Sequence, residues 1–290
     1  MTIMTARHAH LVLPSRRRAL ATTLAMLMLL RPGAPSAAQT PASTDSSHGP
    51  QTLFTRRDAY IGAGFAVLTV AMFPVDQRIA AHLQNRGAQA NHFFKNASHG
   101  FEYMADPGSV VIGVGLYGVG RLAHWNNVAD LGLHGLEAVA LSAGITDVIK
   151  NLAGRARPYF TNDTSASNFG FGRGFKGGSY QSFPSGHTTA AFAAASAVTS
   201  ESERWWPQGI WLVAPVMYGG ATLVGLSRMY NNKHWASDVV LGAGIGTFSG
   251  LKVVRYNHNH PHNFIDRALL HVSVAPDGMR GARLAWSTIP

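Results

Sequence analysis

The sequence contains no cysteine and few charged residues. Without cysteine, disulfide bonds and thiol-based catalysis are excluded for this chain of 290 residues. Charged residues make up 13% of it, whereas about a quarter is usual for a soluble domain. Apolar residues account for 46%, which is enough to bury a sizeable core. Together these proportions predict a helix-rich body rich in alanine and glycine, and they favour contact with a membrane.

The sequence also lacks a dense run of Lys and Arg with interleaved aromatics, so we predict no nucleic acid as a partner. The formal net charge is +10, but five arginines and no acidic residue lie within residues 1–38. The remainder has a net charge of +5, because 19 basic residues face 14 acidic ones. This moderate excess favours an anionic small molecule or a phospholipid surface as the partner.

Residues 1–38 have the pattern of an export signal. Three arginines at residues 16–18 precede an apolar run at residues 19–30, and small residues suited to cleavage follow at residues 36–38. The run is shorter than the ~20 residues that cross a bilayer. We therefore predict a signal peptide and an exported chain, in the periplasm or cell envelope, with its active site on the non-cytoplasmic side. An uncleaved anchor is the alternative.

The rest of the chain is predicted to be mainly α-helical. Residues 39–56, rich in Ser, Thr, Pro and Gln, are interpreted as a disordered linker. Residues 57–255 are predicted to form a bundle of about six core helices with the active-site loops at one end. Residues 256–290 form a tail, where a Pro-Asp-Gly turn signal between two alternating runs predicts a small β-hairpin. The sequence leaves open whether this body is soluble or embedded in a membrane.

Individual helices are predicted from apolar runs. They cover residues 59–75, part of 76–104, 110–123, 133–150, 188–198, 209–226 and 239–254. Residues 154–186 are rich in Gly, Ser, Asn and Phe and are predicted to form a long loop. Because structureless loops beyond ~15 residues are usually functional or disordered, this loop is a candidate part of the active site.

The first of three clusters with catalytic chemistry runs from Lys150 to Pro158. Proline disfavours the helical conformation in the residue before it, so the predicted helix ends ahead of Pro158. Lys150 and Arg157 are then placed at a helix end and in the loop that follows. Taken alone, this cluster equally fits a basic helix terminus that meets the helix dipole.

The second cluster, residues 183–188, opens the next predicted helix. Backbone N–H groups at the start of a helix bind anions, and Gly186 lets a ligand approach the backbone closely. The Ser185 hydroxyl adds a further donor. An ordinary N-cap serine is the alternative for Ser185, but it does not account for the adjacent His187.

The third cluster holds Ser227, Arg228, His234 and Asp238. His234 and Asp238 are four residues apart, so on a helix they share a face. A carboxylate in that position fixes the imidazole tautomer and stabilises its protonated form. A surface His–Asp pair without a role is the alternative.

Taken together, the three clusters supply what phosphoryl transfer requires. The equatorial phosphoryl oxygens need positive groups, and the reaction needs a nucleophile and an acid in line with phosphorus. Lys150, Arg157 and Arg228 provide fixed positive charge, and Ser185 and Gly186 provide neutral donors. The two histidines, with an unperturbed pKa near ~6.5, suit the roles of nucleophile and acid.

In order and spacing, the clusters resemble the motifs of the type 2 phosphatidic acid phosphatase and vanadium haloperoxidase superfamily. Six residues separate Lys150 from Arg157-Pro158; Pro184-Ser185-Gly186-His187 follows; five residues separate Ser227-Arg228 from His234, and three more precede Asp238. No motif position departs from the family pattern. The motifs span residues 150–238, and the helical pattern extends the resemblance to residues 57–255.

The resemblance implies a metal-independent phosphatase of the acid type, without a cofactor. His234 would attack phosphorus and form a phosphohistidine, Asp238 would support His234, and His187 would protonate the leaving group. The phosphoryl oxygens would be held by Lys150, Arg157, Ser185, Gly186 and Arg228. The substrate would be a phosphorylated lipid, such as phosphatidic acid, polyprenyl diphosphate or a lipid A phosphate, or a soluble organic phosphate.

Two other functions fit parts of the pattern. A vanadate-dependent haloperoxidase would use the same pocket with vanadate as its cofactor, although the chain is short for that architecture. A non-catalytic envelope protein that binds anionic lipids would need only the cations, so the set of His187, His234 and Asp238 argues against it. A halide-oxidation assay with vanadate and a phosphate-release assay distinguish the three.

Other features are given no catalytic role. His258, His260 and His262 have the composition of a metal-binding tract, but with Pro261 among them we interpret them as a loop and predict no metal site. The glycines of residues 170–178 lack the Gly-Lys-Ser/Thr ending of a P-loop, so a nucleotide site is not predicted. Phe171 and Phe175 are expected to line a substrate entrance. The pair Trp205-Trp206 fits either a membrane interface or a loop cap.

We predict that His234→Ala abolishes turnover, because the proposed nucleophile is lost. Hydrolysis of p-nitrophenyl phosphate by the purified protein measures this. Activity retained by the variant would contradict the assignment.

Overall fold

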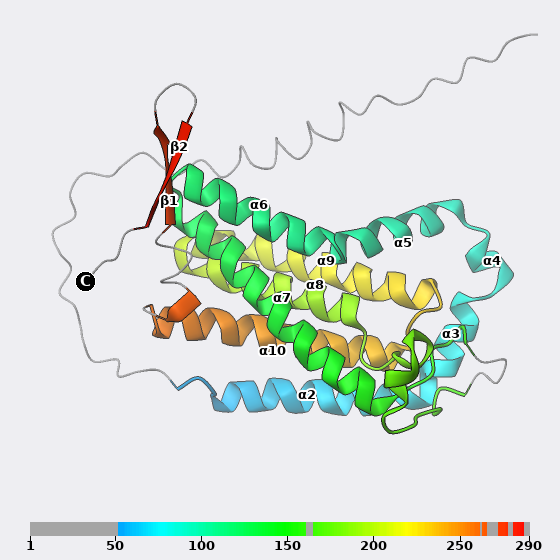
Figure 1. Ribbon diagram of the computed structural model, residues 1–290. Coiled ribbons are helices and arrows are strands. Elements are labelled where there is room, and N and C mark those ends of the chain that lie inside the picture. The colour runs from blue at the N-terminus through cyan, green and yellow to red at the C-terminus, as the bar shows by residue number, and fades with distance from the viewer. Residues whose placement is uncertain (1–51, 161–164, 262, 266–271, 278–280, 287–290) are drawn as a thin grey trace, which may run out of the picture. The chain divides into compact units, whose positions relative to one another are not determined.

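The computed structural model describes residues 52–160, 165–261, 263–265, 272–277 and 281–286, all within one unit of the chain, Pro50–Pro290. The described part is mainly helical, as predicted (Figure 1). Its α-helices are α2 (Arg56–Met72), α3 (Asp76–Leu83), α4 (Arg86–Gln89), α5 (His92–Ala105), α6 (Gly108–Leu122), α7 (Asn126–Ala153), α8 (Gly186–Trp205), α9 (Ile210–Tyr230) and α10 (Ala236–Asn259). The predicted signal peptide and residues 39–51 of the linker lie outside the described residues.

Helices α8 and α10 touch backbone to backbone. Gly242, Gly246 and Gly250 recur every four residues and so lie on one face of α10. A Cβ atom at Gly246 would lie 2.3 Å from the carbonyl oxygen of Thr189, and one at Gly250 would lie 2.6 Å from that of Ala193. Any larger side chain on this face would therefore push the two helices apart.

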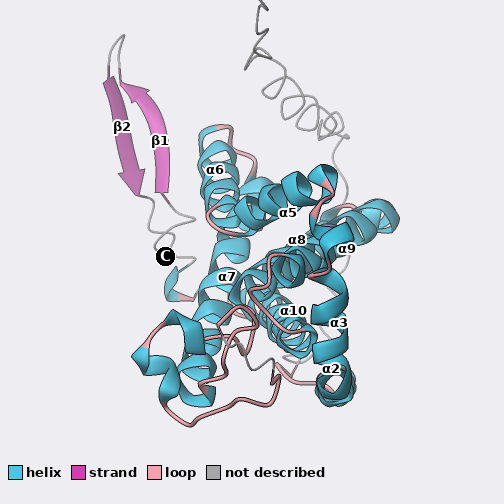
Figure 2. Cartoon of the chain, turned by 90° about the vertical axis from the view of Figure 1, so that its right-hand side faces the viewer, coloured by secondary structure: helices cyan, strands magenta, loops and turns pink. Residues whose placement is uncertain are grey.

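The other long helices surround this pair. Helix α7 packs against α6, α8 and α10, α9 packs against α8 and α5, and α2 packs against α10 (Figures 1 and 2). The contact between α6 and α7 also depends on small residues, since a Cβ atom at Gly132 would lie 2.3 Å from the backbone nitrogen of Tyr117. The glycine and alanine content of the sequence thus serves close helix packing.

A buried carboxylate ties the start of α2 to the last part of α10. Asp58 caps α2 together with Thr55 and is 3% exposed. It forms ion pairs with Lys252 and, at 2.9 Å, with Arg255. A buried carboxylate is stabilised only when such partners are present.

Four helical segments are long and apolar enough to cross a membrane. They are Arg56–Leu83, Asn126–Ala153, Pro207–Tyr230 and Ala236–Asn259. Large apolar side chains lie on the surface of two of them, with Val67 70% exposed and Trp211 87% exposed. An apolar exterior of this kind fits the predicted membrane association.

Several predicted boundaries differ from the observed ones. The helix predicted at residues 188–198 extends to Trp205, because Glu201 and Ser202 are buried inside the bundle and Glu201 pairs with two histidines there. The helix predicted at residues 133–150 begins at Asn126. Residues 76–104 contain three helices in place of the one predicted.

The described residues between α7 and α8, which are 154–160 and 165–185, contain no α-helix and two short 3₁₀ turns, η2 (Arg173–Lys176) and η3 (Gly178–Tyr180). In the tail, β1 (Val272–Asp277) and β2 (Gly281–Trp286) pair in antiparallel register, with Val272 opposite Trp286.

We predict that Gly246→Ala lowers the free energy of unfolding by about 1–3 kcal/mol, because the new methyl group overpacks the contact between α8 and α10. The matched control is Gly219→Ala in α9, where nothing lies within 4 Å of the new Cβ atom. There we expect no loss, and a gain of up to ~1 kcal/mol from helix propensity. Thermal unfolding of the two variants in detergent measures the difference, and equal effects would contradict the packing argument.

Candidate active site

Four helix termini meet at one end of the bundle. Helices α7 and α9 end there, and α8 and α10 begin there (Figure 1, right). Figure 2 views the molecule from this end, with the loops between α7 and α8 toward the viewer. The eight predicted site residues lie on these termini and the adjoining loops: Lys150, Arg157, Ser185, Gly186, His187, Arg228, His234 and Asp238.

Three cations at this end are close enough to act on one another. The positive charges of Arg157 and Arg228 both act on Lys150. Arg228 forms a 2.6 Å ion pair with Glu102 of α5. The Nε atoms of Arg157 and Arg228 are nevertheless buried without a hydrogen-bond partner among the described residues. Buried donors are nearly always satisfied, so these guanidinium groups are suited to an anion that supplies the missing acceptors.

The start of α8 contributes further donors. Ser185 occupies the N-cap position, but its side chain makes no capping hydrogen bond. Its oxygen accepts a hydrogen bond from the Thr188 hydroxyl at 2.8 Å, so the Ser185 hydroxyl keeps its own hydrogen for a ligand. The first backbone N–H groups of a helix also lack an intrahelical acceptor. Ser185 therefore does not act as an ordinary capping serine through its side chain.

Gly186 lies directly against the Lys150 side chain. A Cβ atom at position 186 would be 2.7 Å from the Lys150 Nζ atom. The absence of a side chain thus lets the ammonium group approach the start of α8, where cation and backbone donors face the same ligand.

The position of His234 differs from the prediction. It precedes α10 instead of sharing a helical face with Asp238, and its Nδ1 atom is 3.6 Å from the Asp238 Oδ2 atom, longer than a hydrogen bond. Nδ1 lies 2.7 Å from the carbonyl oxygen of Ser182. Because a carbonyl only accepts, Nδ1 carries the proton, and Nε2 of the neutral ring carries the lone pair.

Asp238 acts on this arrangement through its neighbours. It accepts hydrogen bonds from the Ser182 hydroxyl at 2.5 Å and from the Trp235 backbone N–H at 2.8 Å. It therefore fixes the residue whose carbonyl orients His234, as well as the residue that follows His234. In the described structure Asp238 is a positioning residue for His234.

Sequence analysis missed Arg155, which holds Asp238 in place. Its guanidinium group is fully buried and pairs with Asp238 at 2.5 Å and with Asp76 at 2.7 Å. The rings of Phe169 and Trp235 lie within about 6 Å of it, at 4.9 and 5.5 Å. No local signal distinguishes Arg155 from Arg157, because its two acidic partners are 79 and 83 residues away in the chain.

Both histidines are neutral near pH 7 in the absence of a bound anion. Burial lowers the pKa of His187 to about 4, and the charges of Arg228 and Lys150 act in the same direction, against Asp106 and Glu102. Burial likewise lowers the pKa of His234 to about 4, where Asp238 opposes the effect and two arginines add to it. A negatively charged ligand would raise the pKa of each imidazole.

An open pocket of about 490 Å³ adjoins His187. Its other walls come mainly from α5 and from the residues at the end of α9 and just after it, and they include Lys95, His99, Tyr103 and Lys233. Phe171 and Phe175, expected at the substrate entrance, do not line this pocket and are 90% and 72% exposed. If an anionic group binds at His187, the rest of that ligand would meet the polar, aromatic and cationic side chains of the pocket.

Comparison with known proteins finds this constellation within a region that is similar to one family. The PAP2 superfamily pattern matches residues 132–261. A lipid A 1-phosphatase of Porphyromonas gingivalis is 34% identical over 131 residues, which are 45% of this chain and 24% of that protein. The chain thus matches about a quarter of the length of this relative.

A likeness in fold accompanies the sequence match. The crystal structure of a transmembrane PAP2 type phosphatidylglycerolphosphate phosphatase from Bacillus subtilis has a TM-score of 0.51 and 20% identity to this chain. The match covers 72% of this chain and 99% of that one. Residues 132–261, which contain all eight predicted site residues, are thus similar to the PAP2 superfamily.

Proposed function

We propose that the chain is a phosphatase that hydrolyses a phosphomonoester of a lipid through a phosphohistidine at His234. The observation that carries the proposal is the set of buried Arg157 and Arg228 donors without acceptors, next to an imidazole whose proton is fixed on Nδ1. A phosphoryl group supplies the acceptors, and Nε2 supplies the attacking electron pair.

In the first step, His234 Nε2 attacks phosphorus, and the bond from phosphorus to the leaving oxygen breaks. Phosphate binding raises the pKa of His187, which therefore takes up a proton and then gives it to the leaving oxygen. The cations and the donors of Ser185 and Gly186 hold the three equatorial oxygens. The alcohol leaves, and the phosphoryl group remains on His234.

In the second step, His187 accepts a proton from water as the water oxygen attacks phosphorus. The bond between phosphorus and Nε2 breaks, and inorganic phosphate leaves. The fixed cations perform the charge neutralisation, so the proposed reaction uses no metal ion in this pocket.

Three observations support a lipid substrate. The relative from Porphyromonas gingivalis is a lipid A 1-phosphatase, four helical segments are apolar and long enough to span a membrane, and the pocket beside His187 is open. The export signal pattern supports a periplasmic or envelope location, with the active-site end on the non-cytoplasmic side. Lipid A 1-phosphate and phosphatidic acid are the first substrates to compare.

We predict that His187→Asn accumulates the phosphohistidine when p-nitrophenyl phosphate is the substrate. This substrate has a good leaving group that needs little protonation, so the first step proceeds, whereas the second step loses its base. Mass spectrometry of the alkali-quenched protein locates the phosphoryl group, expected on His234, while phosphate release from lipid A 1-phosphate and from phosphatidic acid in detergent with EDTA reports turnover.

The control for this experiment is Lys176→Ala, which removes an exposed cation of η2 that is not one of the motif residues. It should turn over as the unaltered protein does. A phosphoryl group on another residue, or no phosphate release from any lipid or soluble ester, would overturn the proposal.

We also predict that kcat persists to higher pH than kcat/KM. With no ligand bound, the pKa of His187 is about 4, so its protonated fraction falls tenfold for each pH unit above that value. The bound phosphate raises this pKa, which moves the alkaline limb of kcat upward. Measuring kcat and kcat/KM between roughly pH 3 and 9, on both sides of the ordinary histidine pKa of ~6.5, gives the alkaline limb of each profile.

The substrate has its own ionisation near ~6, which is identical for every variant. The His187→Asn profile therefore serves as the reference, and it should lack the difference between the two alkaline limbs. Coincident limbs in the unaltered protein would contradict the acid role of His187.

A further inference from the structure

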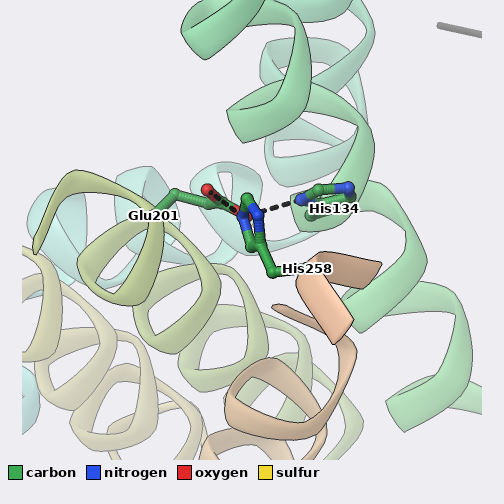
Figure 3. A group of neighbouring side chains, drawn as sticks. All are labelled: His134, Glu201 and His258. Atoms are coloured by element: carbon green, nitrogen blue, oxygen red, sulfur yellow. Dashed lines mark hydrogen bonds and ion pairs between the residues drawn. The ribbon is translucent and has the colours of Figure 1, made fainter. Parts of the chain in front are cut away.

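A second cluster of ligating side chains lies at the end of the bundle remote from His234. His134 of α7, Glu201 of α8 and His258 of α10 point toward one another (Figure 3). Their ligand atoms all lie within 4.8 Å of one another. His134 Nδ1 is 2.5 Å from Glu201 Oε1, and His258 Nε2 is 2.9 Å from Glu201 Oε2.

The cluster is separate from the proposed catalytic chemistry. Sixteen residues of α7 separate His134 from Lys150, which corresponds to about 24 Å along a helix. None of the three residues belongs to the motifs of the PAP2 pattern described above. The proposed phosphatase reaction therefore gives no reason for two imidazoles and a carboxylate at this place.

Burial makes the cluster unusual. His134 and Glu201 are each 2% exposed, and the His258 side chain is 25% exposed. Burying an ionised carboxylate costs free energy unless hydrogen-bonded or charged partners compensate. An ion pair on the surface would avoid that cost, so the burial of Glu201 calls for an explanation. The partly exposed side chain of His258 brings one member of the cluster into contact with solvent.

We propose that His134, Glu201 and His258 bind a zinc ion that joins α7, α8 and α10. Two imidazoles and one carboxylate are an established zinc ligand set, with a fourth position left for water. Zinc bonds to nitrogen and oxygen are about 2.0–2.2 Å long, which sets tetrahedral ligand atoms about 3.3 Å apart. The contacts of the cluster bracket this spacing, so small side-chain rotations admit the ion.

The ligands come from three helices that already pack together, so the site is largely formed before the ion arrives. A neighbouring hydrogen bond also joins two of these helices. Asn257, next to His258, donates it over 2.5 Å to Glu137, which lies one helical turn after His134. A bound ion would therefore stabilise the folded state over the unfolded chain.

Of the two described histidines in the histidine-rich tract considered in the sequence, one is involved. His258 belongs to the cluster, whereas His260 is exposed and stacks on the Tyr256 ring at 4.5 Å. His262 lies outside the described residues. His260 thus provides a matched control in the same segment.

The test is isothermal titration of the full chain, purified in detergent and freed of metal with a chelator, with zinc chloride. We expect one zinc ion per chain, binding lost or weakened at least tenfold in His134→Ala and in Glu201→Gln, and retained in His260→Ala. The thermal midpoint should rise with zinc in the unaltered protein and in His260→Ala, and should not rise in the other two variants.

Cobalt supplies a measurement that needs no variant. Visible absorption bands of tetrahedral cobalt with nitrogen ligands, displaced by zinc, would support the site in the unaltered chain even if a variant failed to fold. No zinc binding up to about 1 mM, which corresponds to a binding free energy near −4.1 kcal/mol, or equal binding in His134→Ala, would overturn the proposal. Because the readouts are binding and stability, they do not depend on phosphatase activity.

Discussion

The buried guanidinium group of Arg155 is the contact on which the active-site end depends. It pairs with Asp76 and Asp238, which belong to α3 and α10. Through Asp238 it fixes Ser182, whose carbonyl orients His234. Removing one partner from a buried ion pair costs about 3–5 kcal/mol, so loss of this arginine would disturb the loop, the helix start and the imidazole together. The geometry at His234 is thus set by a residue that does not face the ligand.

Several cations lie close to this arrangement. Asp238 pairs with Arg155 and accepts a hydrogen bond from Ser182, and its negative charge also acts on Arg157 and Lys150. Glu102 pairs with Arg228, yet the Arg228 Nε atom keeps no acceptor. The low pKa of both imidazoles has a common cause, because burial and the positive charge of nearby arginines both disfavour their protonated forms.

The motifs were predictable from the sequence because their residues are locally spaced and chemically distinctive. The mainly helical class followed from apolar runs, and the Pro158 signal placed a loop after α7. His234 and Asp238 were predicted to share a helical face because they are four residues apart. That prediction was wrong because α10 begins two residues after His234. Arg155 and Glu102 were not predictable, since their partners are distant in sequence and only folding brings them together. The extension of α8 past Val198 was missed for the same reason, because Glu201 is polar in sequence but paired with His134 and His258 inside the bundle.

The glycine face between α8 and α10 restricts which parts of the chain tolerate substitution. His187 stands at the start of one helix and His234 immediately before the other, and the two backbones are in direct contact along three glycines. No side chain at that contact is available to absorb a change in spacing. The pocket walls from α4 and α5 lie outside this contact and carry polar, aromatic and charged side chains, among them Gln89, Lys95 and Tyr103. The glycine contact and these walls are thus built from separate helices, so a substitution in α4 or α5 leaves the spacing of His187 and His234 undisturbed.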